Sequence, residues 1–170
     1  MTAGRFLPRW LLAGLLLLAV GCSSSNQSPV SVPYSVKIGV ELAGDINPYG
    51  DGSAHPLVLR LYQLTELGGF QNAEFLDLYN GDRKVLSDSL VDVLSIGPLT
   101  PDTQQQVAVE LQREARFLGV MAEFADYSNA SSKAVIKLSD QPAKQDISIR
   151  VSGLLVSIVE PPKRAWWQIF

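Results

Sequence analysis

Residues 34–42 read Tyr-Ser-Val-Lys-Ile-Gly-Val-Glu-Leu, and this stretch decides the fold class. Its large apolar residues occupy every second position, with small or polar residues between them. Successive side chains of a β-strand point to opposite faces, so the alternation predicts a strand that is buried on one face. Further strands are predicted at 57–64, 90–96, 104–111, 117–124, 133–138, 147–152 and 154–159. Eight short strands separated by turn residues predict a two-sheet β-sandwich.

Three details of these strands lead to expectations. Segment 117–124 is the most apolar, and because both of its faces look buried we expect it to be a central strand. Gly97-Pro98 is expected to end the strand that begins at Leu90, because proline cannot donate to a sheet ladder. Arg60 lies inside an apolar strand, and we expect either a buried partner or a polar sheet edge there rather than a binding role.

Segment 70–80 breaks the alternation and predicts a helix inserted between the second and third strands. Its apolar residues recur at helical spacing, namely Phe70, Ala73, Leu76 and Tyr79, with Phe75 and Leu78 beside them. Gly68-Gly69 precede this stripe, Gly81 is expected just past its C-terminus, and 84–90 predicts a further short turn. We expect the stripe to pack on a sheet edge or on the end of the barrel, where it would cover an exposed edge strand, and the alternative is a small-ligand site between helix and sheet.

The N-terminal residues have the pattern of a secretory signal. Arg5 and Arg9 precede an apolar run at 11–20, which is too short to span a bilayer stably. Gly21-Cys22 ends the run, and the stretch from Leu18 resembles the bacterial lipobox, in which the cysteine is acylated and becomes the new N-terminus. We therefore expect a cleaved signal at 1–21, a lipidated, flexible tether at 22–33, a domain at 34–160 with its helical insertion near 70–90, and a tail at 161–170.

Composition excludes several classes of function. The chain has 170 residues, which suits one domain, and a formal net charge of −3. Removing residues 1–21 takes away two arginines and leaves 12 basic against 17 acidic residues, so a simple electrostatic nucleic-acid binder is excluded. One cysteine and one histidine exclude disulfides, a multi-cysteine metal site and a histidine-cluster metal site.

The sequence offers no recognisable catalytic or metal-binding motif. A lone histidine, His55, beside a loop proline predicts an ordinary loop residue rather than part of a triad. Segment 45–56 begins like a calcium loop, but its fifth and twelfth positions are Tyr49 and Pro56, so the bidentate carboxylate is missing. We expect neither an enzyme nor a metal site, and no cofactor other than the diacylglycerol and N-acyl lipid on Cys22.

The connection at 44–56 is longer than a hairpin loop, which usually has two to five residues. A loop of this length is either functional or loosely ordered. Ile46 and Tyr49 lie between glycines and prolines and are predicted to be exposed apolar residues. Loops on rigid β scaffolds commonly carry recognition.

Several of these parts together resemble one family, the TssJ outer-membrane lipoproteins of type VI secretion systems. Segment 56–64 matches the family pattern Pro-x-Val-x-Arg-x-Tyr-Gln-Leu, after a loop with Asn47-Pro48 and Asp51-Gly52. Segments 70–79 and 117–124 also resemble the family's helix and its Leu-Gly-Val-Val-Ala-x-Phe strand. The chain departs from the family pattern at 52–56, where it reads Gly-Ser-Ala-His-Pro, and at 130–133, where it reads Ala-Ser-Ser-Lys.

The resemblance implies a transthyretin-like β-sandwich with helical additions, tethered to the outer membrane and facing the periplasm. It implies that the loop at 44–56 contacts the periplasmic C-terminal region of the inner-membrane protein TssM and so helps to build the secretion membrane complex. The implied partner-binding residues are Asp45, Ile46, Asn47, Pro48, Tyr49, Gly50, Asp51 and Gly52, and Cys22 is the implied lipidation site. The alternative function is a periplasmic lipoprotein that binds or transports a small ligand.

Overall fold

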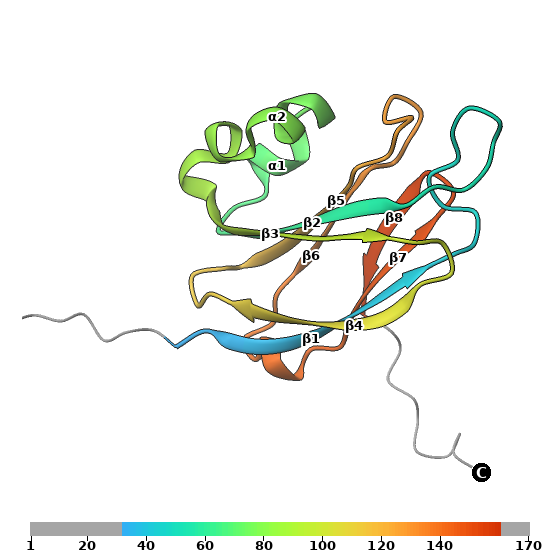
Figure 1. Cartoon of the computed structure of the whole chain (residues 1–170). Helices are drawn as coiled ribbons and strands as arrows, with labels where there is room; N and C mark the ends of the chain where they lie inside the picture. The colour runs from blue at the N-terminus through green and yellow to red at the C-terminus, as the bar shows by residue number, and fades with distance from the viewer. Residues whose placement is uncertain (1–31, 161–170) are drawn as a thin grey trace, which may run out of the picture. The chain divides into compact units, whose positions relative to one another are not determined.

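The computed structural model describes residues 32–160, and these residues form two four-stranded sheets, as Figure 1 shows. The first sheet has the order β4 (Gln104–Leu111), β1 (Tyr34–Leu42), β7 (Ile147–Ser152), β8 (Leu155–Val159). The second has the order β3 (Leu90–Leu99), β2 (Leu57–Leu64), β5 (Phe117–Ala122), β6 (Lys133–Lys137). The predicted mainly β sandwich with a small helical part is confirmed.

The main core lies between the two sheets and follows from the alternation in β1. The inward residues Val36, Ile38 and Val40 are buried, whereas the outward residues between them are not. They pack in one cluster with the inward leucines of β2. β1 lies between antiparallel β4 and parallel β7, so it is an interior strand of its sheet. This interior position is what makes β1 a rigid support for the loop that follows it.

The interior strands of the second sheet, β2 and β5, are largely buried on both faces because two short helices cover the outer side of the sheet. These are α1 (Gly68–Asn72) and α2 (Phe75–Leu86), the green ribbons of Figure 1. Tyr62 of β2 packs against Phe70 of α1, with ring centroids 5.1 Å apart. Gly119 of β5 makes room for that ring, because a Cβ there would lie 3.0 Å from it. This second core explains why β2 is apolar on both faces.

Lys133, in the second segment that departs from the family pattern, holds the end of α1. Its Nζ donates hydrogen bonds to the carbonyl oxygens of Phe70 and Gln71, at 3.0 and 3.1 Å, and to that of Ala73. These are orphan carbonyls of the last helical turn, which need a donor when they are partly buried. Burial lowers the pKa of the Lys133 amine.

The predicted helix at 70–80 differs from the structure. It is broken into two, because Ala73 and Glu74 have extended backbone conformations. Gly81 does not follow the C-terminus: it interrupts α2 with a non-helical conformation, and the helix continues to Leu86. Part of the stripe is exposed, since Leu76 and Tyr79 are 44% and 45% accessible. After the break, α2 still contributes Leu78 and Leu86 to the second core, so only one side of the predicted stripe faces the sheet.

All eight predicted strands are present, with corrections at their ends. The segment predicted at 117–124 ends at Ala122, the one at 133–138 ends at Lys137, and the last begins at Leu155. β5 lies between β2 and β6 and is central, as its apolar sequence predicted. The prediction that Gly97-Pro98 ends β3 was wrong, because the strand continues to Leu99 through a cis Gly97–Pro98 peptide bond. β3 is an edge strand, which tolerates proline where a ladder donor is not required.

The strand registers define two opposite ends of the sandwich. The proximal end consists of residues 32–34, 112–116, 138–146 and 160, where the described chain begins and ends. The loop end consists of residues 43–56, 100–103, 123–132 and 153–154. A nine-residue strand such as β1 separates the two ends by about 30 Å. The predicted signal at 1–21, the tether from Cys22 to residue 31, and the tail at 161–170 lie outside the described residues.

No helix within residues 32–160 combines the length and the apolar character needed to cross a membrane.

Candidate functional site

The connection between β1 and β2, residues 43–56, forms an ordered projection at the loop end (Figure 1). It is a small hairpin of its own, in which the His55 N–H donates to the Ile46 carbonyl at 3.1 Å. Tyr49 and Ser53 form an antiparallel bridge nearer the tip. A loop of this length was expected to be either functional or loosely ordered, and these hydrogen bonds show that it is ordered.

Asn47 fastens this loop to the rest of the sandwich. Its side-chain oxygen accepts a hydrogen bond from the backbone N–H of Ala125 at 2.8 Å, and its Nδ2 donates to the Pro56 carbonyl at 2.9 Å. Asn47 has a φ of 50°, in the left-handed region that asparagine tolerates better than most residues. Asn47 is buried. The asparagine of the family-like Asn47-Pro48 pair therefore holds the loop in place.

Asp45 connects the same loop to the turn between β7 and β8. Its Oδ1 accepts hydrogen bonds from the Gly153 N–H at 3.1 Å and from the Ser152 hydroxyl at 3.4 Å. The Asn47 N–H donates to the Gly153 carbonyl at 2.9 Å. Three separate connections of the sandwich therefore meet at the base of this loop, and they hold it in one conformation.

The two apolar residues that were predicted to be exposed behave differently. Tyr49 is 58% accessible and stands near the tip. Ile46 is completely buried and belongs to the main core, so its predicted exposure was wrong. The loop folds back over the open end of the sandwich, and Ile46 fills the space between the two sheets there. A single-sequence pattern does not reveal this, because the return of the loop is a tertiary contact.

The tip of the loop is shaped by its glycines and by Asp51. Gly50 and Gly52 have φ values of 65° and 83°, which side chains rarely adopt. The Ser53 hydroxyl and backbone N–H both donate to Asp51 Oδ1, at 2.6 and 3.0 Å. These hydrogen bonds lower the pKa of Asp51. The tip therefore presents an exposed aromatic ring, on a backbone held by hydrogen bonds, near a carboxylate that stays charged.

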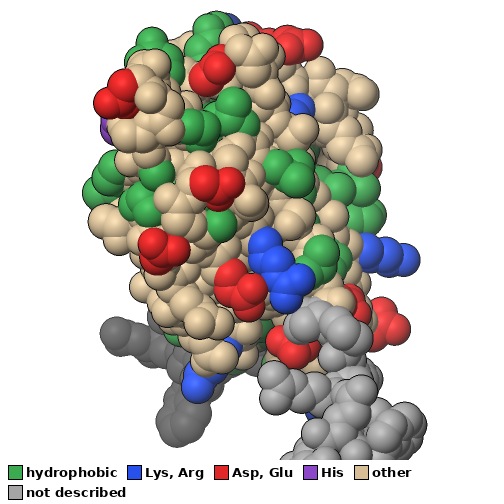
Figure 2. Space-filling model, turned by 90° about the vertical axis from the view of Figure 1, so that its right-hand side faces the viewer, with side chains coloured by type: hydrophobic (Ala, Val, Ile, Leu, Met, Phe, Trp, Pro, Cys, Tyr) green, Lys and Arg blue, Asp and Glu red, His purple; other side chains and the backbone are tan. Residues whose placement is uncertain are grey.

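The surface around the loop is acidic. Figure 2 faces the loop end and shows separate groups of hydrophobic side chains with more acidic than basic side chains among them. Asp45, Asp51 and Asp102 are exposed here, and the Arg150 charge is paired with Glu41 at 3.0 Å. A hollow of about 430 Å³ lies at the foot of the loop, between Ala43, Asp102 and Ser152. A surface of this kind suits a partner with apolar and basic groups.

An aromatic stack joins two residues of the predicted helical stripe to Tyr127, which the sequence pattern does not mark. Phe75 of α2 stacks on Tyr127, with centroids 4.8 Å apart, and on Tyr79, with centroids 5.8 Å apart. Tyr127 belongs to the connection that also contains Ala125, the backbone partner of Asn47. A hollow of about 280 Å³ adjoins the stack. No spacing or motif marks Tyr127, because it lies in an irregular segment.

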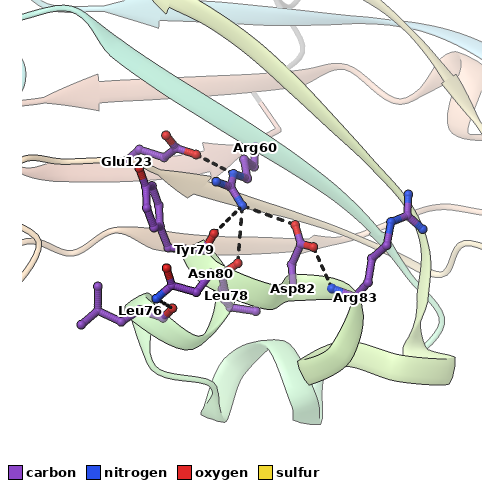
Figure 3. Close-up of polar contacts among 8 residues, drawn as sticks. All are labelled: Arg60, Leu76, Leu78, Tyr79, Asn80, Asp82, Arg83 and Glu123. Carbon is purple, nitrogen blue, oxygen red and sulfur yellow. Dashed lines mark hydrogen bonds and ion pairs between the residues drawn. The ribbon is translucent and has the colours of Figure 1, made fainter.

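Arg60 joins the second sheet to α2, as Figure 3 shows. Its Nε donates to Glu123 Oε1, and its Nη1 donates to the Tyr79 carbonyl at 3.2 Å and lies 3.5 Å from Asp82. Burial alone would lower the pKa of Arg60, but the hydrogen bond and charge of Glu123 outweigh it and raise that pKa. Of the two alternatives expected for Arg60, the structure shows a partner within the fold.

Gln63 joins the two sheets to each other. Its Nε2 donates to the Glu110 carbonyl at 2.9 Å, and its Oε1 accepts from the Gln112 N–H at 2.7 Å. Arg60 contacts α2, and Tyr62 packs against Phe70 of α1. The side chains of the Arg-x-Tyr-Gln-Leu stretch therefore make contacts that hold the fold together. The motif that carries the family resemblance therefore identifies a fold, and the candidate binding loop lies outside it.

The described residues show no grouping typical of a metal site. Within residues 32–160 no three His, Cys, Asp or Glu side chains are grouped so that they could hold a metal ion. His55 is an exposed loop residue. The alternative ligand site was placed beside Phe70, Phe75 and Tyr79. The space at Phe70 is filled by its own ring and by Tyr62, both completely buried, whereas a hollow of about 280 Å³ adjoins Phe75 and Tyr79.

Comparison with known proteins places this arrangement in a family. The model of the family described as "Type VI secretion lipoprotein, VasD, EvfM, TssJ" matches residues 34–154. The chain belongs to this type VI secretion lipoprotein family. The matched residues include both sheets up to the start of β8, so this TssJ-family assignment applies to nearly the whole described domain.

Solved structures agree with the TssJ-family assignment. The type VI lipoprotein TssJ1 from Pseudomonas aeruginosa is 28% identical, with a TM-score of 0.70 over 76% of this chain and 98% of that one. Serratia marcescens Lip, a membrane-bound component of the type VI secretion system, is 21% identical, with a TM-score of 0.67 over 76% and 99%. A chain in the structure described as the TssM C-terminal domain from EAEC is 21% identical, with a TM-score of 0.62 over 75% and 98%. Among curated proteins, none matches the chain.

Proposed function

We propose that this TssJ-family lipoprotein is acylated on Cys22, stands on the periplasmic side of the outer membrane, and binds TssM through the loop at 43–56. Its role is to connect that membrane to the type VI secretion membrane complex. The observation that carries the proposal is the exposed ring of Tyr49 at the tip of a loop whose base is fixed by buried Asn47. A rigid loop that presents an aromatic residue has the character of a binding hot spot.

The position of the loop supports the proposed arrangement. Val32, where the described chain begins, lies at the proximal end, and the loop lies at the other end of β1. Cys22 precedes Val32 by ten residues, a length that spans at most about 35 Å. An acyl chain on Cys22 would keep the proximal end near the membrane, and the loop would then point away from the membrane.

The chemistry of the loop end indicates what the partner surface contains. Tyr49 and the stack of Phe75, Tyr79 and Tyr127 offer apolar contact area, and Asp45 and Asp51 add negative charge. We infer that the TssM surface contributes apolar side chains together with lysine or arginine. Chains with this fold occur in structures described as a type VI membrane complex and as the TssM C-terminal domain, which supports the choice of partner.

The test is binding of the TssM periplasmic region to the mature chain and to Tyr49→Ala. We expect the affinity to fall at least 30-fold, since loss of an aromatic hot spot costs about 2 kcal/mol or more. Leu94→Ala, which truncates another exposed apolar residue on edge strand β3, is the matched control. Unchanged affinity for Tyr49→Ala, or a loss only in Tyr127→Ala, would reject the loop as the principal contact.

A further inference from the structure

We propose that a pocket at the proximal end binds the phosphate group of an anionic phospholipid, and that this contact holds the proximal end against the membrane. The inference rests on the membrane anchoring in the proposed function and adds a second, non-covalent contact to it. It concerns residues of the β4–β5 connection and the end of β6, which the partner loop does not use.

The pocket is a hollow of about 440 Å³ between two segments far apart in sequence. Arg113 and Arg116 line it from the β4–β5 connection, and Lys137 and Asp140 line it from the end of β6 and the following turn. The Leu138 N–H donates to the Arg116 carbonyl at 2.9 Å, which fixes the two segments side by side. The pocket is therefore part of the folded framework.

Three cations line this pocket with one carboxylate, that of Asp140. Arg113, Arg116 and Lys137 are exposed, and within residues 32–160 none of the three takes part in an ion pair. The Arg116 guanidinium is positioned by donating from Nη1 to the Arg113 carbonyl at 3.0 Å. Arginine pairs with phosphate through two parallel hydrogen bonds, and lysine supplies a point charge, so the set suits a phosphate group.

Arg113 links the pocket to the place where the chain enters the domain. Its Nε donates to the Val32 carbonyl at 2.7 Å, its Nη1 donates to the Tyr34 hydroxyl at 3.2 Å, and its guanidinium lies 4.7 Å from the Tyr34 ring centroid. The pocket thus adjoins the segment that leads back to Cys22. A lipid anchor there brings the pocket within reach of neighbouring headgroups.

The chain also leaves the described domain beside the pocket. Gln145 Nε2 donates to the Lys137 carbonyl at 3.0 Å and to the Glu160 carboxylate. Residues 161–170, outside the described part, include Lys163, Arg164, Trp166 and Trp167. Basic residues and tryptophan are the types enriched where proteins meet a membrane surface. Both connections of the domain and the cationic pocket therefore lie at the same end.

The experiment measures vesicle binding by the chain from residue 22 to 170 with Cys22→Ser, so that no acyl group contributes. Both hydrophobic clusters are drawn from residues 36–158, so this chain contains the whole core. We expect it to co-sediment with vesicles of equal parts phosphatidylcholine and phosphatidylglycerol, more weakly at high salt, and not with phosphatidylcholine alone. The pair Arg116→Gln and Lys137→Gln should lower the partition coefficient about 25-fold, or about fivefold per cation.

The pair Arg83→Gln and Lys84→Gln is the matched control, because it removes one arginine and one lysine from exposed positions on α2. We expect less than a twofold change for it. An equal loss in both pairs would indicate net charge alone and would overturn the inference. Binding of inorganic phosphate by the pocket without binding to phosphatidylglycerol vesicles would assign it to a free anion and would overturn it as well.

A chain that ends at Glu160 lacks residues 161–170, so its vesicle binding measures the pocket without the tail. We expect the pocket pair to lower vesicle binding in this shorter chain too. The inference fails if vesicle binding is lost when residues 161–170 are removed and the double variant Arg116→Gln, Lys137→Gln has no effect in the longer chain. The tail would then make the contact. Because no acyl group is present, any of these negative results leaves the Cys22 anchor and the TssM-binding loop untouched.

Discussion

The side-chain oxygen of Asn47 accepts a hydrogen bond from the backbone N–H of Ala125, 78 positions further along the chain, at 2.8 Å. This bond joins the loop after β1 to the connection after β5. The second bond of Asn47, to the Pro56 carbonyl, closes the loop on itself. One buried side chain therefore sets the conformation in which Tyr49 is presented.

Replacing Asn47 with alanine should destabilise the protein by about 2–4 kcal/mol. The Ala125 N–H and the Pro56 carbonyl lose their partner, and alanine fits poorly at a φ of 50°. Urea unfolding measures the change, and Asn47→Gly tests the hydrogen bonds without the backbone strain. Asp51→Ala at the exposed tip is the control, with an expected effect below about 0.5 kcal/mol. Equal unfolding midpoints for Asn47→Ala and Asp51→Ala would contradict this role of Asn47.

Replacing Arg60 with methionine should cost about 3 kcal/mol and loosen α2. It leaves Glu123 and the Tyr79 carbonyl without their donor in a partly buried site. Hydrogen exchange should speed up over residues 75–86 more than over β1. The control is Arg150→Met, which breaks an exposed pair with Glu41 and should cost about 1 kcal/mol or less. Unchanged protection of α2 would show that Arg60 is dispensable for its docking.

Tyr62→Phe should not destabilise the protein at neutral pH, although Tyr62 belongs to the family-like motif. Its hydroxyl is buried without a hydrogen-bond partner in the described structure, so the variant loses only an unsatisfied polar atom. We expect the free energy of unfolding to stay the same or to rise by about 1 kcal/mol. A loss above about 1 kcal/mol in urea unfolding would show that the hydroxyl has a favourable contact.

The same variant tests the pH dependence that Tyr62 imposes. Burial raises the pKa of Tyr62 from 10.0 to about 12, which outweighs the opposite effect of the nearby Arg60 charge. Because the folded protein keeps this proton longer than the unfolded chain, stability is fully present below pH 10 and is lost as the pH rises toward 12. Compared with Tyr62→Phe, the natural protein should lose about 2 kcal/mol more across that range. Parallel curves for the two proteins would contradict the raised pKa.

Cys22→Ser should release the protein from the outer membrane. Serine cannot form the thioether that carries the diacylglycerol, and cleavage at a lipidated cysteine depends on that step. Membrane fractionation should show the variant lost from the outer-membrane fraction and retained, with its signal uncleaved, in the inner-membrane fraction, and mass spectrometry of the natural protein should show the acyl mass on Cys22. Cys22→Ser that stays in the outer-membrane fraction in high salt would contradict the anchor.

The regular elements could be predicted from the sequence because their signals are local. Alternation at 34–42 placed β1, and an apolar segment at 117–124 correctly predicted an interior strand. Ile46 was misjudged because its burial depends on how the loop returns over the sheet ends. Tyr127 was missed because it lies in an irregular connection and gains its stacking partner Phe75 only through tertiary packing. The loop at 43–56 was recognised by its length, whereas the roles of its side chains depend on contacts with residues far apart in sequence.

The interior position of β1 has a mechanical consequence. The strand connects the segment that leads back to Cys22 with the loop that carries Tyr49, and it is paired with β4 on one side and β7 on the other. Pulling between the membrane anchor and a bound partner would load β1 along its length. Its ladder hydrogen bonds run across the strand, so they would resist this force together in shear rather than open one by one. A domain connected in this way would bear tension between two membranes without unravelling from either end.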